Sequence, residues 1–224
     1  MSRYRKKTIK SRFDKAMLAT TLLCLLPMVI GLALYVQLPE SIATHFNLRN
    51  EADGFSSKNF AVFGLPLLMA LLNMFVHFML NNDPKKANFS NHLTTLAKLF
   101  VPILSTVVII MIFTFNLGYE MNIGRIITIM VSLFFIMVGV FLPQCKQNYS
   151  MGIRIPWTLN DPEIWDKTHR LAGFLWILGG ILMFISAFLP ETASQIVFWI
   201  IMAMIIIMPF FYAYILYRRT LPSS

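Results

Sequence analysis

Residues 99–119 read LFVPILSTVVIIMIFTFNLGY, a run of 21 residues without Asp, Glu, Lys or Arg. An α-helix rises about 1.5 Å per residue, so the run would extend about 30 Å, the thickness of the hydrocarbon core of a bilayer. It is apolar on every face, whereas the strands of a membrane barrel alternate apolar and polar residues. The run therefore predicts a transmembrane helix.

Five further charge-free runs share this character: residues 16–39, 59–82, 126–144, 171–190 and 192–217. Of the 224 residues, 57% are hydrophobic and only 13% are charged, against roughly 25% charged in soluble domains. We predict an all-α integral membrane protein, a bundle of six transmembrane helices. The first run follows a basic segment, as in a signal peptide, but it is too long and lacks a cleavage site, so we interpret it as an uncleaved helix.

The cations predict the orientation of this bundle. If the N-terminus is cytoplasmic, every Lys and Arg except Arg49, Lys58 and Arg125 lies on the cytoplasmic side. This is the distribution of the positive-inside rule, so we expect both the N and C termini in the cytoplasm. The net charge of +9 then indicates contact with anionic membrane lipids, and we expect no direct nucleic-acid partner.

The expected organisation follows from these runs. Residues 1–15 form a basic cytoplasmic tail, and residues 16–82 hold the first two transmembrane helices with an outer loop at 38–58. Residues 83–217 hold four further helices with a cytoplasmic loop at 143–170, and residues 218–224 form a second cytoplasmic tail. Residues 81–98 are polar and basic, typical of a solvated connector with a helical extension into the third transmembrane helix. The glycines of the fifth run are expected to let helices approach closely.

Patterns of catalysis and metal binding are missing from the sequence. It contains no HExxH, no glycine-rich phosphate loop and no paired intramembrane aspartates, so we expect neither an enzyme nor a cofactor or resident metal. No acid or base other than His77 lies within a run, which disfavours an ion-coupled transporter. We expect His77 to bond a neighbour at the membrane interface, and we expect no disulfide between Cys24 and Cys145.

The outer loop reads LPESIATHFNLRNEADGFSSK from residue 38 to residue 58. Pro39 ends the first helix, and Asp53-Gly54 indicates a turn. We expect a folded loop held by bonds from Asn and Asp side chains to the backbone. A metal site at His45, Asp53 and Glu40 is a weaker alternative, because their spacing matches no known ligand pattern.

The inner loop reads PQCKQNYSMGIRIPWTLNDPEIWDKTHRLAG from residue 143. Asp161 followed by Pro162 predicts a helix start, since Asp is a strong N-cap and Pro suits the first helical position. Residues 152–157 are expected to be extended, because a residue that precedes proline avoids helical angles. Trp157 and Trp165 are expected at the headgroup level. An interfacial anchoring segment and a recognition surface both fit this pattern.

The two loops resemble the SdpI/YfhL family of bacterial membrane immunity proteins. The outer loop is similar to the family's N-terminal module, LPxxIxxHFNxxGxxDxxxSK, through Leu38, Pro39, Ile42, His45, Phe46, Asn47, Asp53, Ser57 and Lys58. The inner loop is similar to NxxxGIRxPWTLxxxxxWxxTHRxxG through Asn148, Gly152, Ile153, Arg154, Pro156, Trp157, Thr158, Leu159, Trp165, Thr168, His169, Arg170 and Gly173. Asn50 stands where a glycine is usual, and we expect the turn to survive because Asn tolerates left-handed backbone angles.

The resemblance implies a multi-pass protein of the bacterial plasma membrane that protects the producing cell against a secreted toxic peptide. It also implies a second role, as a sensor that recruits a cytoplasmic transcriptional repressor. The residues expected to bind a ligand or partner are His45, Asn47, Asp53, Asn148, Gly152, Arg154, Pro156, Trp157, Thr158, Trp165, Thr168, His169 and Arg170.

A small membrane permease or channel is the alternative function. It requires a polar path at mid-depth, for which the candidates are Thr20, Thr21, Asn73, Ser105, Thr106, Thr114, Asn116, Thr128, Ser132 and Ser186. Side chains that face one central cavity would favour the permease, and side chains scattered and bonded to helix carbonyls would disfavour it. A membrane enzyme ranks third, since it requires titratable groups that converge in one loop cluster.

Overall fold

The computed structural model describes residues 14–47 and 50–221. Six helices in it are long and apolar enough to span a membrane: α1 (Lys15–Ala33), α2 (Leu65–Asn82), α3 (Asn91–Asn116), α4 (Ile123–Phe141), α6 (Pro162–Ser186) and α7 (Glu191–Thr220). A π-helical turn, Phe60–Gly64, precedes α2, and α5 (Pro156–Asn160) is a single short helix. The prediction of a six-helix membrane bundle is confirmed.

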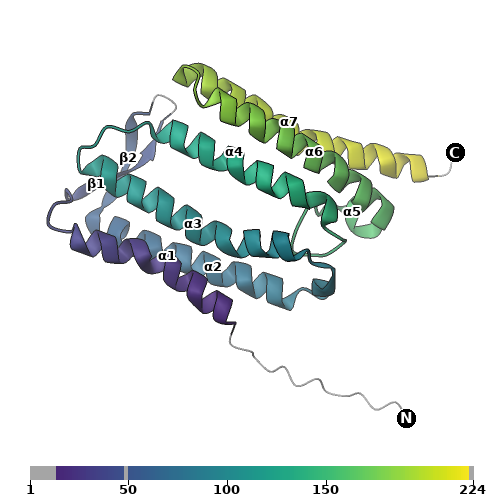
Figure 1. Ribbon diagram of the computed structural model, residues 1–224, viewed down its shortest axis with the longest axis horizontal. Coiled ribbons are helices and arrows are strands. Elements are labelled where there is room, and N and C mark those ends of the chain that lie inside the picture. Colours follow the sequence, from purple (N-terminus) through teal and green to yellow (C-terminus); the bar gives the residue numbers. More distant parts are fainter. Residues whose placement is uncertain (1–13, 48–49, 222–224) are drawn as a thin grey trace, which may run out of the picture.

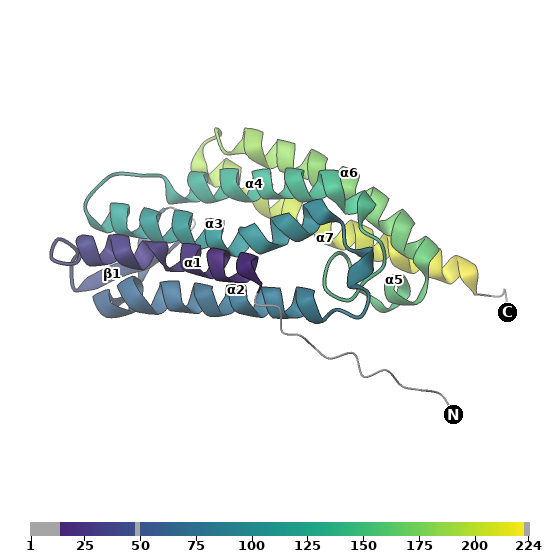
Figure 2. The ribbon, with the colours of Figure 1, turned by 60° about the horizontal axis from the view of Figure 1, so that its bottom comes forward.

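The six helices form two groups of three. Helices α1, α2 and α3 pack against one another, and α6 packs between α4 and α7. The groups meet along a narrower seam between α3 and α4, where Phe100 and Phe134 have ring centroids 4.2 Å apart. Figures 1 and 2 show this arrangement from two directions. The start of α1 and the end of α7 lie at the same end of the bundle (Figure 1). The cytoplasmic placement of that end stays a prediction.

The predicted outer loop is a β-hairpin. Strand β1 (Ser41–Phe46) pairs with β2 (Ala52–Ser57) in antiparallel register, with Ala43 opposite Phe55 and a bulge near His45. Asn50 has a φ of 59°, so the tip turns through a left-handed residue as expected. Side-chain bonds to the backbone do hold the tip, since the Asn47 Oδ1 accepts from the Glu51 N–H. The loop is thus folded as expected, and its flanks form a strand ladder that the sequence pattern did not predict.

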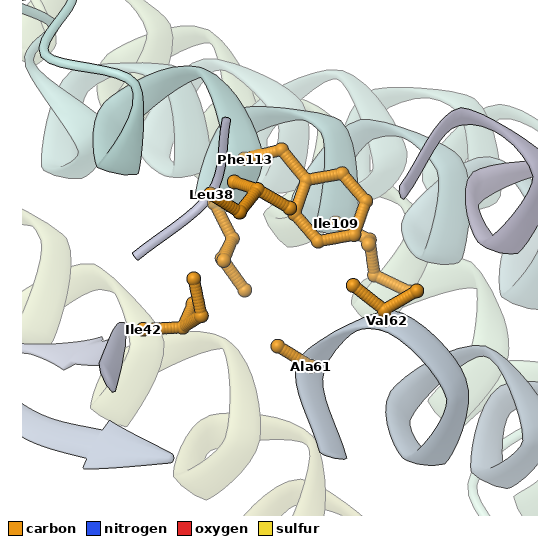
Figure 3. Close-up of a cluster of buried hydrophobic side chains, with 7 residues drawn as sticks. Leu38, Ile42, Ala61, Val62, Ile109 and Phe113 are labelled. Atoms are coloured by element: carbon orange, nitrogen blue, oxygen red, sulfur yellow. The ribbon is translucent and has the colours of Figure 1, made fainter. Parts of the chain in front are cut away.

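The hairpin is seated on a hydrophobic core at one end of the first group. Ile42 of β1 packs with Val62 and with Phe113 of α3 in a cluster of buried side chains (Figure 3). Gly31 of α1 faces the Phe113 ring, where a Cβ would come within 2.9 Å of it. The hairpin therefore has a fixed position on the helices. We call this the hairpin end, and the opposite end, which carries residues 143–173, the motif end.

Glycines set the spacing within the second group, as the fifth run predicted. A Cβ on Gly173 of α6 would lie 2.8 Å from the backbone oxygen of Gly139 in α4. Likewise, a Cβ on Gly179 would lie 2.9 Å from methyl groups of Ile201 and Ile205 in α7. The backbones of α4 and α6 therefore touch, which small residues permit in membrane helices.

Polar side chains within the spans do not form a common path. Most donate to backbone carbonyls, as Thr106 does to Pro102, Thr128 to Gly124 and Ser186 to Met183. The Ser105 hydroxyl donates to the Cys24 carbonyl of α1. By the criterion stated above, this scatter disfavours a permease.

Candidate functional site

The motif end is built on the start of α6. The Asp161 side chain caps this helix by accepting from the Glu163 and Ile164 N–H groups, as Asp before Pro162 predicts. The exposed pair Glu163 and Lys167 lies at 2.6 Å, one turn apart. Two turns of polar helix therefore precede the apolar part of α6.

A buried aromatic pair lies at the centre of this end. Trp165 and His169 stack with ring centroids 4.0 Å apart, and both side chains are 0% exposed. The Trp165 indole N–H donates to the Cys145 carbonyl at 2.6 Å. Trp165 is therefore held inside the fold, with a protein partner for its N–H, and its depth at the headgroup level stays a prediction.

The bonds of His169 define its tautomer. Its Nδ1 lies 2.8 Å from the Trp165 carbonyl, which can only accept, so Nδ1 carries the hydrogen. Its Nε2 accepts from the Ile153 N–H at 3.0 Å. A neutral His169 thus joins α6 to the loop, and an added proton on Nε2 would break the bond to Ile153.

Gly152 is the position where only glycine fits. Its φ is +91°, and a Cβ there would collide with His169 Nε2. This places the loop backbone directly against the Nε2 edge of the histidine ring. The signature glycine is therefore explained by both its backbone angle and its contact.

Loop residues satisfy each other's backbone groups. The buried Asn148 Oδ1 accepts from the Ser150 and Met151 N–H groups. The Thr158 hydroxyl accepts from the Ile155 N–H, while Ile155 itself is extended, with φ −116° and ψ 160°. The predicted extended segment 152–157 is correct at Ile155 and wrong at Gly152, whose φ is positive. It is also wrong for Pro156 and Trp157, because Pro156 begins the short helix α5.

Trp157 contacts the last turns of α7. Its ring lies 5.1 Å from those of Phe210 and Tyr214 and 6.2 Å from that of Tyr217, centroid to centroid. Arg154, Pro156 and Arg170 are exposed. The Arg154 guanidinium also donates to the Tyr149 carbonyl. The signature thus divides into a buried framework and an exposed surface.

One buried carboxylate of the motif end, Asp83, was not singled out by any sequence pattern. Asp83 is 4% exposed, and its Oδ2 accepts from the Tyr149 N–H at 2.9 Å and the Ser150 hydroxyl at 2.6 Å. Gln147 bonds the Lys85 ammonium and, through its amide, the Thr158 carbonyl. The connector expected to be solvated is therefore bound to the inner loop. It ties the first helix group to the motif.

Cys145 lies within this framework as a free thiol. Burial raises its pKa to about 11, so the thiol stays protonated at neutral pH. Thr168 is buried, and its hydroxyl has no hydrogen-bond partner among the described residues.

The hairpin end carries the other predicted residues. His45 Nδ1 and Asp53 Oδ1 lie 2.6 Å apart across the two strands, both exposed. Asn47 donates to the Glu51 carboxylate. Glu40 pairs with the Lys58 ammonium at 2.8 Å, so the third ligand of the alternative metal site is directed elsewhere.

Asn50 joins the hairpin to the second helix group. Its Oδ1 accepts from the Ile123 N–H at 2.8 Å, and its Nδ2 donates to the Met121 carbonyl. This bridge reaches the start of α4, and a glycine at position 50 would lack it. The hairpin residues and the motif residues therefore lie at opposite ends, and the structure does not bring them into one site.

Residues 144–214 match the SdpI/YfhL protein family. A second match, to a domain of unknown function (DUF1648), covers residues 22–70 and includes the hairpin. Immunity protein SdpI from Bacillus subtilis (strain 168) is 29% identical over 180 residues, which cover 78% of this chain and 82% of the relative. No solved structure matches the chain. The chain is a multi-pass protein of the bacterial plasma membrane, and the resemblance to the SdpI/YfhL family is confirmed.

A third polar cluster lies outside the SdpI/YfhL segment, at the motif end of the first helix group. His77 is buried, with Nε2 3.0 Å from the Thr20 hydroxyl and Nδ1 3.2 Å from Asp14 Oδ2. Lys98 of α3 lies 3.4 Å from the same carboxylate oxygen, and Asn73 donates to Thr20. His77 is bonded to neighbours as expected, and its place at the membrane interface stays a prediction.

Asp14, just outside the first span, is held ionised by this cluster. Burial by itself would raise its pKa, but hydrogen bonds from Asn81 and His77 and the charge of Lys98 outweigh it and lower the pKa from 3.8 to about 2. A carboxylate with a depressed pKa stabilises the fold above its unfolded pKa, and this contribution is lost as pH falls through the folded pKa.

We expect Asp14→Asn to lower the free energy of unfolding at pH 7 by about 2 kcal/mol, given about 1.36 kcal/mol per pKa unit. Between pH 4 and pH 2, the wild type should lose this advantage while the variant shows a flatter profile. Thermal unfolding in detergent micelles across that range measures both. Parallel profiles of the two proteins would contradict the assignment.

Proposed function

We propose that this chain is an immunity protein that protects its own cell against a secreted toxic peptide. The observation that carries the proposal is the similarity to Immunity protein SdpI over 180 residues. The architecture supports it, because the polar loops are folded into two ordered structures at opposite ends of the bundle, the β-hairpin and the motif of residues 143–173. With the predicted orientation, the hairpin end faces the outside, where a secreted peptide arrives.

The second part of the proposal is that the motif end serves as the sensing face. Its buried members, such as Trp165 and His169, hold the loop, and its exposed members, Arg154 and Arg170, are available to a cytoplasmic repressor protein. Sensing requires that the toxin bind one of two bundle conformations more tightly than the other. The seam between α3 and α4 is where the two helix groups can shift, because the contacts across it are few.

Protection is tested by producing the protein in a strain killed by the toxin against which the Bacillus subtilis relative protects. We expect the producing cells to survive a toxin dose at least ten-fold above that which kills empty-vector cells. Cells that contain verified amounts of protein in their membranes, yet die at the control dose, would refute immunity to this toxin.

Sensing is tested with the double variant Arg154→Glu, Arg170→Glu in the same cells. Protection should persist, while a repressor captured by the wild type in the presence of toxin should be lost. Lys86→Glu is the matched control, since Lys86 is an exposed cation of the same end outside the motif. Equal capture of the repressor by the wild type, the double variant and the control would show that the motif surface does not take part in sensing.

A further inference from the structure

The two edges of the hairpin differ in how their backbone groups are bonded. On the β1 side, Asn116 of α3 takes the place of a neighbouring strand: its Oδ1 accepts from the Ala43 N–H at 2.8 Å, and its Nδ2 donates to the Ala43 carbonyl at 3.1 Å. A side-chain amide thus reproduces both bonds of a strand pair. The β1 edge is closed by α3.

The register then fixes where the opposite residue of β2 points. Ala43 lies directly across from Phe55. Its N–H and C=O are bonded away from β2, so this is a non-hydrogen-bonded pair of the antiparallel ladder, and both of its members direct their backbone groups outward. The Lys58 N–H donates to the Glu40 carbonyl, as the alternation of such pairs requires. The Phe55 N–H and C=O therefore point to the outer edge of β2.

This outer edge is open in the part of the chain that the structure describes. No described backbone or side-chain group bonds the Phe55 N–H or C=O there. Its side chain is 62% exposed, although a phenylalanine ordinarily lies inside a fold. An open strand edge beside an exposed aromatic ring is the arrangement that binds an extended peptide as an added strand.

The charge of this end indicates the chemistry of the peptide. Described acidic residues outnumber cations there: the acids are Glu40, Glu51, Asp53, Glu120 and Glu191, and the cations are Lys58 and Arg125. The sequence adds Arg49, which lies outside the described residues. Lys58 is buried against Glu40, and Asp53 belongs to β2 itself. The field at the open edge therefore attracts positive charge.

We propose that an extended, positively charged segment of the toxic peptide binds along the outer edge of β2 as a third strand, with Phe55 as its apolar contact. The inference rests on the proposed function and adds the binding surface to it. The Asn116 clamp keeps the hairpin in place when the strand is added, because it holds the opposite edge to α3.

The comparison of Phe55→Pro with Phe55→Thr tests the edge through the backbone, because both variants lose the phenylalanine ring. Proline removes the outward N–H without touching a bond of the ladder, and the preceding Gly54 tolerates the backbone restriction that proline imposes. Phe55→Thr is the matched control, since it keeps the N–H and suits a strand. Relative to Phe55→Thr, we expect Phe55→Pro to lower the lethal toxin dose about ten-fold. This is the change in affinity that corresponds to the loss of one hydrogen bond worth about 1.4 kcal/mol.

The outcomes separate this inference from the proposed function. If wild-type cells die at the dose that kills empty-vector cells, the immunity function fails. If wild-type cells survive and Phe55→Pro cells survive equally well, immunity stands and the edge-binding proposal is overturned. Equal melting temperatures of the purified variants establish that the comparison concerns binding and not folding.

Amide hydrogen exchange on the wild-type protein gives a second answer that needs no variant. Adding the toxin to the protein in micelles should slow exchange in residues 52–58 at least ten-fold, while polylysine at the same charge concentration should not. Unchanged exchange would overturn the proposal. Slowing caused by phosphatidylglycerol vesicles without toxin would assign the edge to the membrane surface and overturn it as well.

Discussion

Trp165→Ala is expected to lower the free energy of unfolding by about 3 to 5 kcal/mol, the range for removing a large buried aromatic side chain. Trp165 is 0% exposed and packs with Leu93 of α3 and Cys145 in one core cluster. Its loss would also leave the Cys145 carbonyl and one face of the His169 ring without their contacts. Thermal unfolding in micelles measures the change.

Trp199→Ala is the matched control for this experiment. Trp199 lies on α7 and is 59% exposed, on a surface that lipid covers in the membrane, so we expect a change below about 1 kcal/mol. Trp165→Phe should fall between the two, because it keeps the stacking on His169 but loses the indole hydrogen bond. Equal destabilisation by Trp165→Ala and Trp199→Ala would contradict a framework role for the motif.

Hydropathy predicted the six spans for a physical reason. In lipid every backbone N–H and C=O must be bonded within the protein, so a spanning segment is either a helix or a strand of a closed barrel, and the sequence pattern excludes a barrel. The start of α6 was predicted to the residue, since Asp161 and Pro162 act locally at a helix N-terminus. The ends of other helices were less certain. For example, a helical extension of α3 into the polar connector was expected, but not its start at Asn91, eight residues before the charge-free run.

The hairpin was missed because its stabilising contacts are remote. Neither SIATHF nor ADGFSS alternates clearly between apolar and polar residues. The ladder is held in position by Ile42 in the core of the first helix group and by Asn116, which is 73 residues from Ala43 in the chain. Local propensity contains no information about such a partner.

The resemblance identified the motif residues but not what each one does. Trp165 and Thr158 were expected to bind a ligand or partner, yet both are buried and bonded to the chain itself. Asp83 and Gln147 could not be singled out from sequence, because an acid or amide in a polar loop is ordinary. Only the fold brings Asp83 to Tyr149, 66 residues away.

The two helix groups differ from the seam between them in how firmly they are packed. Within the second group, α4 and α6 touch through backbone atoms, whereas the groups are joined at their two ends by polar bridges, through Asn50 at one end and Asp83 at the other. Bridges of a few hydrogen bonds can exchange partners, and a close-packed glycine contact cannot. If the bundle has two conformations, each group should therefore move as a unit.

Gly139→Leu is expected to break this unit and to lower the free energy of unfolding by about 3 kcal/mol, the upper part of the range for overpacking. A Cβ on Gly139 would already lie 2.8 Å from the Gly173 oxygen and 2.9 Å from the Ile177 nitrogen, both backbone atoms that cannot rotate away. The α4 and α6 axes must separate, and toxin protection should fall with stability.

Gly124→Ala in the first turn of α4 is the matched control, because the nearest atom to a Cβ there would be 3.5 Å away. There the higher helix propensity of alanine should leave stability unchanged or raise it by up to about 1 kcal/mol. A Gly139→Leu protein with the melting temperature of the wild type would show that the second group is not packed through its backbones.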